Sequence, residues 1–338
     1  MGAGQTIGYA TEYGVPILLG SILIILSNAL YGVFRGEGDS KRPMYAMIAS
    51  AILNMILDPI FIYYLNLGVG GAAIATLISS LCVILILCYW LYFKKDTYLK
   101  PTLGNFNFNR DISMDIVKVG IPASIQLLNN AFFAAVFSAL LVYVGSTDSV
   151  AVYSTGWRIV IITTTPLLAI GTALISVIAA NFGAKNYKNI QIAHRYAMKV
   201  SLVIAIIVMV LTNVFAGDIA SIFTSGGSSA RISSELTSFI AWIVIYYPTM
   251  AVGVPSTYVF QGIGKGITAM FQTIMRETGF TIFFAVLLSV VLGYGVWGAW
   301  MGIVLGEIVS NNLTGIWADW QIKKLMNING YTPLISSK

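Results

Sequence analysis

The sequence predicts an all-α polytopic membrane protein, and three observations support this fold class. Of its 338 residues, 57% are hydrophobic and only 9% are charged, and the mean hydropathy is +0.83; soluble domains contain about a quarter charged residues. The apolar residues form continuous runs of about 20 or more, which favours membrane-spanning helices over the alternating strands of a membrane barrel. Lysine and arginine gather in every second loop between these runs, as expected for loops on the cytoplasmic side.

Nine apolar runs are each long enough, at about 1.5 Å per helical residue, to cross a hydrocarbon core of about 30 Å. Residues 1–13 precede them and have the composition of a connector, without the pattern of a signal peptide. The predicted transmembrane helices cover residues 14–34, 44–64, 70–93, 115–144, 150–180, 194–216, 235–260, 268–293 and 296–317.

The loop charges predict an orientation. Basic loops lie near 35–43, 94–114 and 181–195, and further lysines follow the seventh and ninth helices. The positive-inside rule therefore places the C-terminus in the cytoplasm and residue 1 outside, in a cell membrane. The net charge of +6 follows from these loops, and no basic stripe with interleaved aromatic residues indicates a nucleic-acid partner.

An internal repeat divides the chain into two regions. Residues 33–48 align without gaps on 259–274, an offset of 226 positions, and 68–73 resemble 295–300 one residue out of register. Both copies lie at the same kind of basic loop, so the repeat is parallel, as in transporters built from two related halves. The second copy contains six helices and the first only its last three, so we expect three further helices to precede this sequence in an intact two-lobe protein. The alternative is a true nine-helix protein, whose N-terminus would then lie outside.

This comparison predicts the domain organisation. Residues 1–95 form the C-terminal half of an N-lobe, 96–114 form a cytoplasmic linker, and 115–338 form a six-helix C-lobe with a cytoplasmic tail.

Asp58 is the one charged residue in the run 44–64. An aspartate near the centre of a transmembrane helix costs roughly 2.5–3.5 kcal/mol, so a chain that retains one usually uses it. Asn54 lies one helical turn earlier on the same face, and Pro59 removes a backbone donor and favours a bend. We expect Asp58 to exchange a proton or Na⁺; the alternative is a structural carboxylate bonded to neighbouring helices.

The segment LYGVFRGEGDSKRPMYAMIASAILNMILDPIFIYYLNLGVGGAAIATLIS resembles the multidrug and toxic compound extrusion (MATE) transporters, most closely their DinF-like branch. Its motifs are RGxGDxKxPM, LNxxLDPxF and GxxGAAxAT. The resemblance implies twelve helices in two lobes around a central cavity, and export of amphipathic, often cationic compounds against an H⁺ or Na⁺ gradient. It also implies an ion-coupling cluster in the N-lobe made of Tyr13, Asn54, Asp58 and Thr76. A first-helix aspartate of the family has no counterpart in this sequence.

The repeat predicts that this cluster belongs to the N-lobe alone. At the offset of 226, the C-lobe positions that correspond to the cluster are apolar. Tyr13 maps to Phe239, Asn54 to Phe280, Asp58 to Phe284, and Thr76 to Gly302 or Ile303.

Further polar residues lie inside predicted helices. Arg158 with Glu307 or Glu277 forms a candidate buried ion pair, because charged groups in helix bundles tend to pair. Gln126, Asn129, Asn130 and Asn28 are candidates to line the substrate cavity, and the alternative for the first three is hydrogen bonding across helices. The single histidine, His194, has the position of a solvated or capping residue, and no Cys/His cluster indicates a metal cofactor.

The sequence therefore predicts a secondary active transporter and no enzyme: a monomer in the lipid bilayer that exports amphipathic small molecules. Its coupling ion is H⁺ or Na⁺, with Asp58 and Asn54 as the Na⁺ ligands in the second case, and it needs no other cofactor. The first alternative is a flippase for lipid-linked precursors, which an Arg- and Lys-rich cavity would favour. A further alternative is a membrane scaffold that transports nothing.

Overall fold

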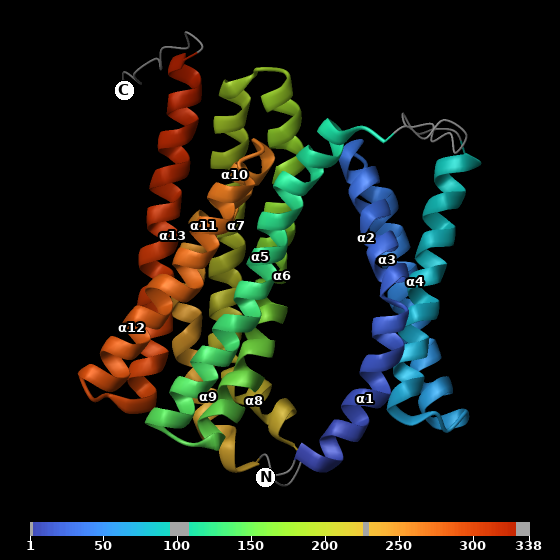
Figure 1. Ribbon diagram of the computed structural model, residues 1–338. Helices are drawn as coiled ribbons and strands as arrows, with labels where there is room; N and C mark the ends of the chain where they lie inside the picture. The colour runs from blue at the N-terminus through green and yellow to red at the C-terminus, as the bar shows by residue number, and fades with distance from the viewer. Residues whose placement is uncertain (1–2, 95–107, 226–229, 329–338) are drawn as a thin grey trace. The chain divides into compact units, whose positions relative to one another are not determined.

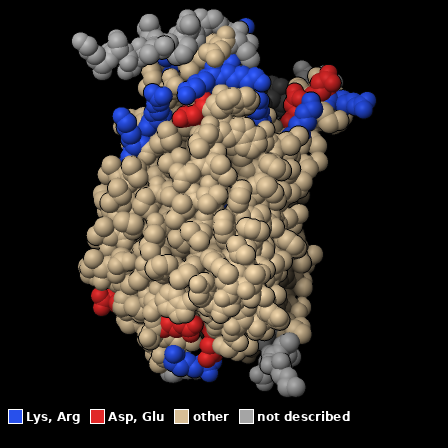
Figure 2. Space-filling view, turned by 90° about the vertical axis from the view of Figure 1, so that its left-hand side faces the viewer, with Lys and Arg blue, Asp and Glu red and all other residues tan. Residues whose placement is uncertain are grey.

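The computed structural model describes residues 3–94, 108–225 and 230–328, and throughout these ranges the ordered elements are helices (Figure 1). The chain divides into two compact units, Met1–Phe108 and Asn109–Lys338, called unit 1 and unit 2 below. On the face shown in Figure 2, lysine and arginine gather mainly at one end of the helices, and the middle of that face carries no charge.

Unit 1 consists of α1 (Ala3–Leu19), α2 (Ser21–Gly36), α3 (Lys41–Pro59), the π-helical turn η1 (Ile60–Tyr64) and α4 (Gly68–Tyr92). Phe34 of α2 is fully buried and packs with apolar side chains of α3 and α4 to form its core. Helix α1 begins at Ala3, so the prediction that residues 1–13 are a connector is wrong from there on.

A bend of 55° separates α1 from α2 at Gly20. The N–H of Gly20 still donates to the carbonyl of Pro16 at 2.8 Å, and a Cβ at Gly20 would collide with the side chain of Leu77. Glycine therefore permits α4 to approach the bend closely. At Pro59 no such break occurs, because the helix continues as the π-helical turn η1.

Unit 2 is built around α10, which packs against α6, α7 and α13 and is mostly buried. Capping side chains define two of its helix starts: Asn109 accepts from the N–H of Asp111, and Ser146 accepts from that of Asp148. The elements are α5 (Arg110–Val144), α6 (Thr147–Gly183), α7 (Tyr187–Val214), α8 (Ala216–Thr224), η3 (Ala230–Ile232), α9 (Ser233–Ile243), η4 (Val244–Tyr246), α10 (Tyr247–Gly262), α11 (Gly266–Ile274), η5 (Met275–Thr281), α12 (Ile282–Val286), η6 (Leu287–Val291) and α13 (Gly295–Ile328).

Within the described ranges, seven helices are long and apolar enough to cross a membrane, or eight when the bent pair α1–α2 counts as one span. These correspond to the first eight predicted helices. The ninth prediction, 296–317, is also helical as part of α13, but α13 is not apolar enough to meet the same criterion. Its polar residues, among them Glu307, Asn311 and Asn312, explain the difference.

The predicted repeat is confirmed by the turns that end α2 and α10. Gly38 and Gly264, which are 226 positions apart, both have positive φ, of 83° and 75°. The next residue in each turn donates to the carbonyl five positions back: Asp39 to Phe34 at 3.0 Å, and Lys265 to Phe260 at 2.8 Å. Two remote segments thus form the same αL-terminated helix end.

Beyond this turn the register of the repeat changes by one residue. Gly68 and Gly295, with φ of 54° and 57°, are 227 positions apart, and so are two matching hydrogen bonds, Leu67 to Phe61 and Tyr294 to Leu288, both 3.1 Å. The cause is the π-helical turn η5, because such a turn adds one residue to a helix, and α3 has no such turn at the corresponding place.

This change of register corrects the predicted counterparts of the Asp58 cluster. Asn54 corresponds to Thr281 rather than to Phe280, and Asp58 corresponds to Ala285 rather than to Phe284. The counterpart of the aspartate is therefore still apolar, whereas that of the asparagine is polar. The one-residue slip near 68–73 contained this information, but the sequence alone does not show where the extra residue lies.

Candidate functional site

Asp58 lies on α3 and, among the described residues, has a single hydrogen bond from a side chain. Asn54 Nδ2 donates to Asp58 Oδ1 at 3.2 Å, and both residues are half-buried. From Pro43 to Phe93 the sequence contains no lysine, no arginine and no other acid. Within the described part of the chain, Asp58 forms no ion pair, so its carboxylate lacks an internal counter-charge.

Thr76 of α4 faces the same region from the neighbouring helix. Its hydroxyl donates to the carbonyl of Ala72 at 2.9 Å, so this side chain bonds to its own helix. Thr76 and Asn54 nevertheless line one common cavity of about 250 Å³, which opens between α2, α3 and α4. The other polar side chains on this cavity are Tyr31, Ser50, Ser79 and Ser80.

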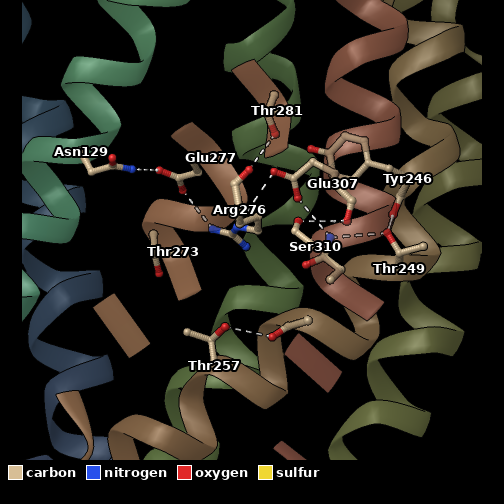
Figure 3. Close-up of polar contacts among 12 residues, drawn as sticks. Asn129, Tyr246, Thr249, Thr257, Thr273, Arg276, Glu277, Thr281, Glu307 and Ser310 are labelled. Atoms are coloured by element: carbon tan, nitrogen blue, oxygen red, sulfur yellow. Dashed lines mark hydrogen bonds and ion pairs between the residues drawn. The ribbon is translucent and has the colours of Figure 1, made fainter. Parts of the chain in front are cut away.

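The second polar region lies within unit 2, around the π-helical turn η5 (Figure 3). Arg276 Nη2 donates to Glu277 Oε1 at 3.0 Å, and Arg276 Nε lies 4.0 Å from Glu307 Oε1 on α13. Glu307 is 6% exposed, and its Oε2 accepts from Asn311 Nδ2 at 3.1 Å. One guanidinium thus lies between the buried carboxylate of Glu307 and the half-buried carboxylate of Glu277.

Asn129 of α5 connects Glu277 to a further helix. Its amide donates to Glu277 Oε2 at 2.9 Å and accepts from the Thr278 hydroxyl at 2.6 Å. Asn130, with its amide nitrogen turned toward Glu277, donates to Oε1 of the same carboxylate at 2.9 Å. Each charged group in this network thus has a partner of opposite charge, which is the requirement for burying charges.

Comparison with known proteins identifies the family. The MatE family model matches residues 2–60 and 122–294, more than half of the sequence. The chain belongs to the MatE family.

Curated relatives of this MatE chain include multidrug transport proteins. It is 23% identical to the probable multidrug resistance protein YoeA of Bacillus subtilis, over 100% of this chain and 71% of that protein. It is 27% identical to the multidrug export protein MepA of Staphylococcus saprophyticus (86% and 60%) and 28% identical to DETOXIFICATION 43 of Arabidopsis thaliana (66% and 41%). The MatE chain therefore spans 41–71% of the length of these three relatives.

Solved structures agree with the assignment. A MOP superfamily transporter from Pyrococcus furiosus, described as having a binding pocket of reverse polarity, matches with a TM-score of 0.93 and 35% identity over 96% of this chain and 72% of its own. An outward-facing multidrug resistance MATE family transporter matches with a TM-score of 0.92, at the same identity and coverage. The relatives are transporters rather than enzymes, and the MatE chain is a multi-pass membrane protein.

The structure brings together three of the four residues predicted for ion coupling in this MatE chain. Asn54 bonds Asp58, and Asn54 and Thr76 share the cavity. Tyr13 is 40% exposed on α1, and in the described ranges it forms no hydrogen bond to the other three. Asn28 is exposed on α2, donates to the carbonyl of Ile24 at 2.8 Å and does not line the unit 1 cavity; its place on a substrate cavity stays a prediction.

The predicted ion pair had the right acids and the wrong arginine. Glu277 and Glu307 pair with Arg276, whereas Arg158 is exposed and, among described residues, forms no hydrogen bond or ion pair. On α6, Gly156, Ile159 and Val160 are buried, so Arg158 points away from the core of unit 2.

Three polar residues of α5 and α7 take part in helix contacts, which for Gln126 and Asn129 is the alternative to cavity lining that the sequence left open. Asn129 bonds across helices, and Gln126 accepts from Thr273 at 3.4 Å. His194 is fully buried rather than solvated; its Nε2 lies 3.0 Å from Ser256 Oγ, and its Nδ1 lies 3.7 Å from Asp319. In the part of the chain that is described, no three His, Cys, Asp or Glu side chains gather to hold a metal ion.

Sequence reasoning missed the serines of the unit 1 cavity. Ser50 lies one turn before Asn54 on α3, so the spacing Ser50–Asn54–Asp58 places three polar groups on one helix face. This row of polar residues on one helix face is the sequence feature that could have indicated the serines of the cavity. A lone serine in a membrane helix usually bonds to its own backbone, and this is why the residue type alone does not indicate a site.

Proposed function

We propose that this chain is part of a multidrug efflux antiporter that exports amphipathic, often cationic compounds by alternating access, driven by an inward gradient of H⁺ or Na⁺. The MatE membership and the multidrug names of its relatives support the substrate class. Its two units belong to the two lobes of such a transporter, unit 1 to the N-lobe and unit 2 to the C-lobe. The linker 96–114 falls largely outside the described residues.

Asp58 carries the proposal. It lies inside a membrane-spanning helix, has one amide partner, and has no lysine or arginine between Pro43 and Phe93 to neutralise it. A carboxylate in such surroundings is stable either when protonated or when a cation lies beside it. Exchange between these states is the chemistry that ion coupling requires, and Asn54 and Thr76 supply neutral oxygen atoms for both.

The bend at Gly20 is the element that could respond to this exchange. It separates α1 from α2 and contacts α4 through Leu77, and α4 also carries Thr76. A change of charge at the α3–α4 interface would therefore alter the packing at the bend. In the proposed cycle, this repacking reshapes the substrate cavity between an inward-open and an outward-open state.

The test uses the full-length protein in proteoliposomes, with an imposed Na⁺ or pH gradient and a fluorescent cationic dye. Asp58→Asn keeps the shape of the side chain and removes its charge, so gradient-driven efflux should fall to the level of empty liposomes. Asp115→Asn is the matched control, because Asp115 forms only an exposed ion pair with Lys118 and should retain wild-type efflux. Wild-type efflux by a stably folded Asp58→Asn protein would contradict the proposal.

One observation favours the alternative of a flippase for lipid-linked precursors. Arg158 is an exposed arginine inside the predicted membrane region, and such a residue can bind a phosphate group. If Arg158→Gln abolished the translocation of a fluorescent phospholipid while dye efflux was absent throughout, the flippase would replace the antiporter. No flux of either probe would favour a scaffold.

We also propose a cell membrane location with the C-terminus in the cytoplasm, and a monomeric state with no nucleic-acid partner. The gathering of lysine and arginine at one end of the helices supports this orientation by the positive-inside rule (Figure 2). A protease site placed after Lys338 should be cut in inverted vesicles and protected in intact cells.

A further inference from the structure

Five exposed cations of unit 2 lie on two neighbouring helices without acidic partners. Helix α7 carries Lys188, Arg195 and Lys199 and contains no aspartate or glutamate, and the last turns of α13 add Lys323 and Lys324. Within the described ranges, none of the five forms an ion pair. They belong to the end of the helices where lysine and arginine gather (Figure 2).

The one acid beside these cations is directed away from them. Asp319 of α13 is four residues before Lys323, a spacing at which acids and bases on a helix often pair. Among the described residues, however, its carboxylate pairs with neither lysine of α13. Its Oδ1 lies 3.7 Å from Nδ1 of the buried His194 on α7 and has no hydrogen-bond partner. The positive charge of the two helices is therefore left uncompensated.

Helix geometry places the cations on one side of the α7–α13 pair. The two helices pack against each other in opposite directions, with His194 and Asp319 between them (Figure 1). Successive residues turn by about 100° around a helix, and in antiparallel neighbours this turn leads to the same side of the pair. Arg195 and Trp320 therefore point the same way, and both are exposed. The same geometry brings the other cations to this side: Lys188, Lys199, Lys323 and Lys324.

These five cations and Trp320 are called the α7–α13 patch below. Trp320 is 55% exposed, and Lys324 Nζ lies 5.2 Å from the centre of its ring. Tryptophan is enriched where a membrane helix leaves the hydrocarbon and enters the headgroup region. The patch therefore has the composition of a surface at headgroup depth.

An exposed apolar strip continues from the patch toward the middle of the helices. Leu202 and Ile206 of α7 and Leu313 and Ile316 of α13 are all exposed, and their spacing from Arg195 and Trp320 places them on the same side of the pair. A cationic patch above an apolar strip is complementary to a molecule with an anionic head and hydrocarbon tails. A free anion would use only the patch.

We propose that the α7–α13 patch binds the headgroup of an anionic phospholipid, whose acyl chains lie along the apolar strip. The lipid belongs to the cytoplasmic leaflet in the orientation proposed above. The Arg195 guanidinium can donate two N–H groups to phosphate oxygens. Lys199, on the membrane side of Arg195, extends its long side chain toward the headgroup, and Lys323 adds a further charge from α13.

The start of α5 shows a different arrangement of charge within unit 2. Arg110 and Lys118 are accompanied there by Asp111 and Asp115, and Lys118 Nζ lies 3.0 Å from Asp115 Oδ1. The two bases and the two acids cancel, so this segment offers an anionic lipid little net attraction. It supplies a matched control for the patch.

The test follows the unfolding temperature of the purified full-length protein in a neutral detergent. The protein is titrated with phosphatidylglycerol, which is anionic, or with phosphatidylcholine of the same acyl chains, which has no net charge. Phosphatidylglycerol should stabilise the wild type at lower concentrations. Arg195→Gln/Lys199→Gln should raise the phosphatidylglycerol concentration for half-maximal stabilisation about 30-fold, the change expected when two basic residues near an anionic surface are lost.

Without added lipid, Arg195→Gln/Lys199→Gln should unfold at the temperature of wild type, because both side chains are exposed and unpaired. This separates loss of a binding site from loss of a structural contact. Arg110→Gln/Lys118→Gln removes the same formal charge from unit 2 and should keep the wild-type dependence on phosphatidylglycerol. Inorganic phosphate is titrated in parallel and should not reproduce the stabilisation.

Three results would overturn the inference: equal stabilisation by the two lipids, a wild-type response of Arg195→Gln/Lys199→Gln, or an equal loss in the α5 control. The last would mean that total charge, rather than the patch, attracts the lipid. If inorganic phosphate stabilised the wild type as strongly as phosphatidylglycerol, the patch would be a site for free phosphate and the lipid proposal would fail. The inference goes beyond the proposed antiport, and none of these results bears on Asp58.

Discussion

Units 1 and 2 share a repeat, but the carboxylates within their helices differ in whether an arginine pairs with them. In unit 1, Asp58 has one amide partner among the described residues, and the sequence has no arginine or lysine between Pro43 and Phe93. In unit 2, Glu277 and Glu307 share Arg276, Asn129 of α5 donates to Glu277, and Asn311, on the same helix as Glu307, donates to Glu307. The same helix pair thus holds an internal cation in one unit and none in the other.

The difference indicates which carboxylate can exchange an ion. A carboxylate already paired with a guanidinium gains little from an external cation, because the attraction is in place and the hydrogen bonds are satisfied. An unpaired carboxylate in the same kind of environment gains much more. We therefore infer that unit 2 uses its charges for structure and that unit 1 keeps its charge for coupling.

The largest expected effect comes from removing the internal cation of unit 2. Arg276→Met leaves Glu277 and Glu307 buried without a positive partner, and it should destabilise the protein by about 3–5 kcal/mol. Replacing both acids in the same protein, as Arg276→Met/Glu277→Gln/Glu307→Gln, should restore most of this loss. Unfolding of the purified full-length protein measures both.

Arg158→Met is the matched control for this experiment, since Arg158 is exposed and has no partner in the described part of unit 2. It should change the stability little. If Arg276→Met were as stable as Arg158→Met, the acids of unit 2 would be neutralised by something other than Arg276, and the contrast between the units would fail.

The sequence predicted those features that depend on local spacing. Asp58 and Asn54 are four residues apart on one helix, so their contact follows from helix geometry alone. The glycines of the 33–48 and 259–274 segments are likewise local, and both turns form as the repeat predicts. Length and apolar composition were sufficient to locate the second to eighth predicted membrane helices.

The predictions that were wrong or missing concern features that depend on how the helices are rotated and packed. Whether Arg158 or Arg276 faces Glu307 is decided by the rotation of α6 and of the η5 turn, and spacing along the chain does not determine this. The extra residue of η5 also has no marker in the residue types, so the counterparts of Asn54 and Asp58 were displaced by one. The cavity needs α2, α3 and α4 together and is not visible in any one of them.

Introducing the Arg276–Glu307 pair of unit 2 at the corresponding positions of unit 1 also tests the comparison. Its expected effect on stability is smaller than that of Arg276→Met. Ser50 corresponds to Arg276 at the offset of 226, and Ser80 corresponds to Glu307 at the offset of 227 that holds beyond η5. Ser50→Arg/Ser80→Glu therefore places a guanidinium and a carboxylate at these positions. The built-in cation should then replace the coupling ion, so the full-length protein should lose driven efflux in the proteoliposome assay.

The reading of this experiment depends on a folded variant, which a single symmetric peak in size-exclusion chromatography establishes. A folded double variant with the driven efflux of wild type would show that the coupling ion binds elsewhere. Ser50→Thr is the conservative control, because it keeps the hydroxyl and should keep most of the driven efflux.

The smallest effect is expected from substitutions at the two glycine turns of the repeat. They test whether the two turns contribute equally to the free energy of unfolding as well as having the same shape. Gly38 and Gly264 have φ of 83° and 75°, and a Cβ at either position would meet no atom within 4 Å. Alanine should therefore cost only the strain of the left-handed conformation, about 1 kcal/mol in each copy. Asparagine, which tolerates this conformation, should cost less, and unfolding of the full-length protein gives both values. If alanine greatly lowered the free energy of unfolding at one glycine and left it unchanged at the other, the two turns would contribute unequally to stability. The units would then differ in their backbone energetics as well as in their charges.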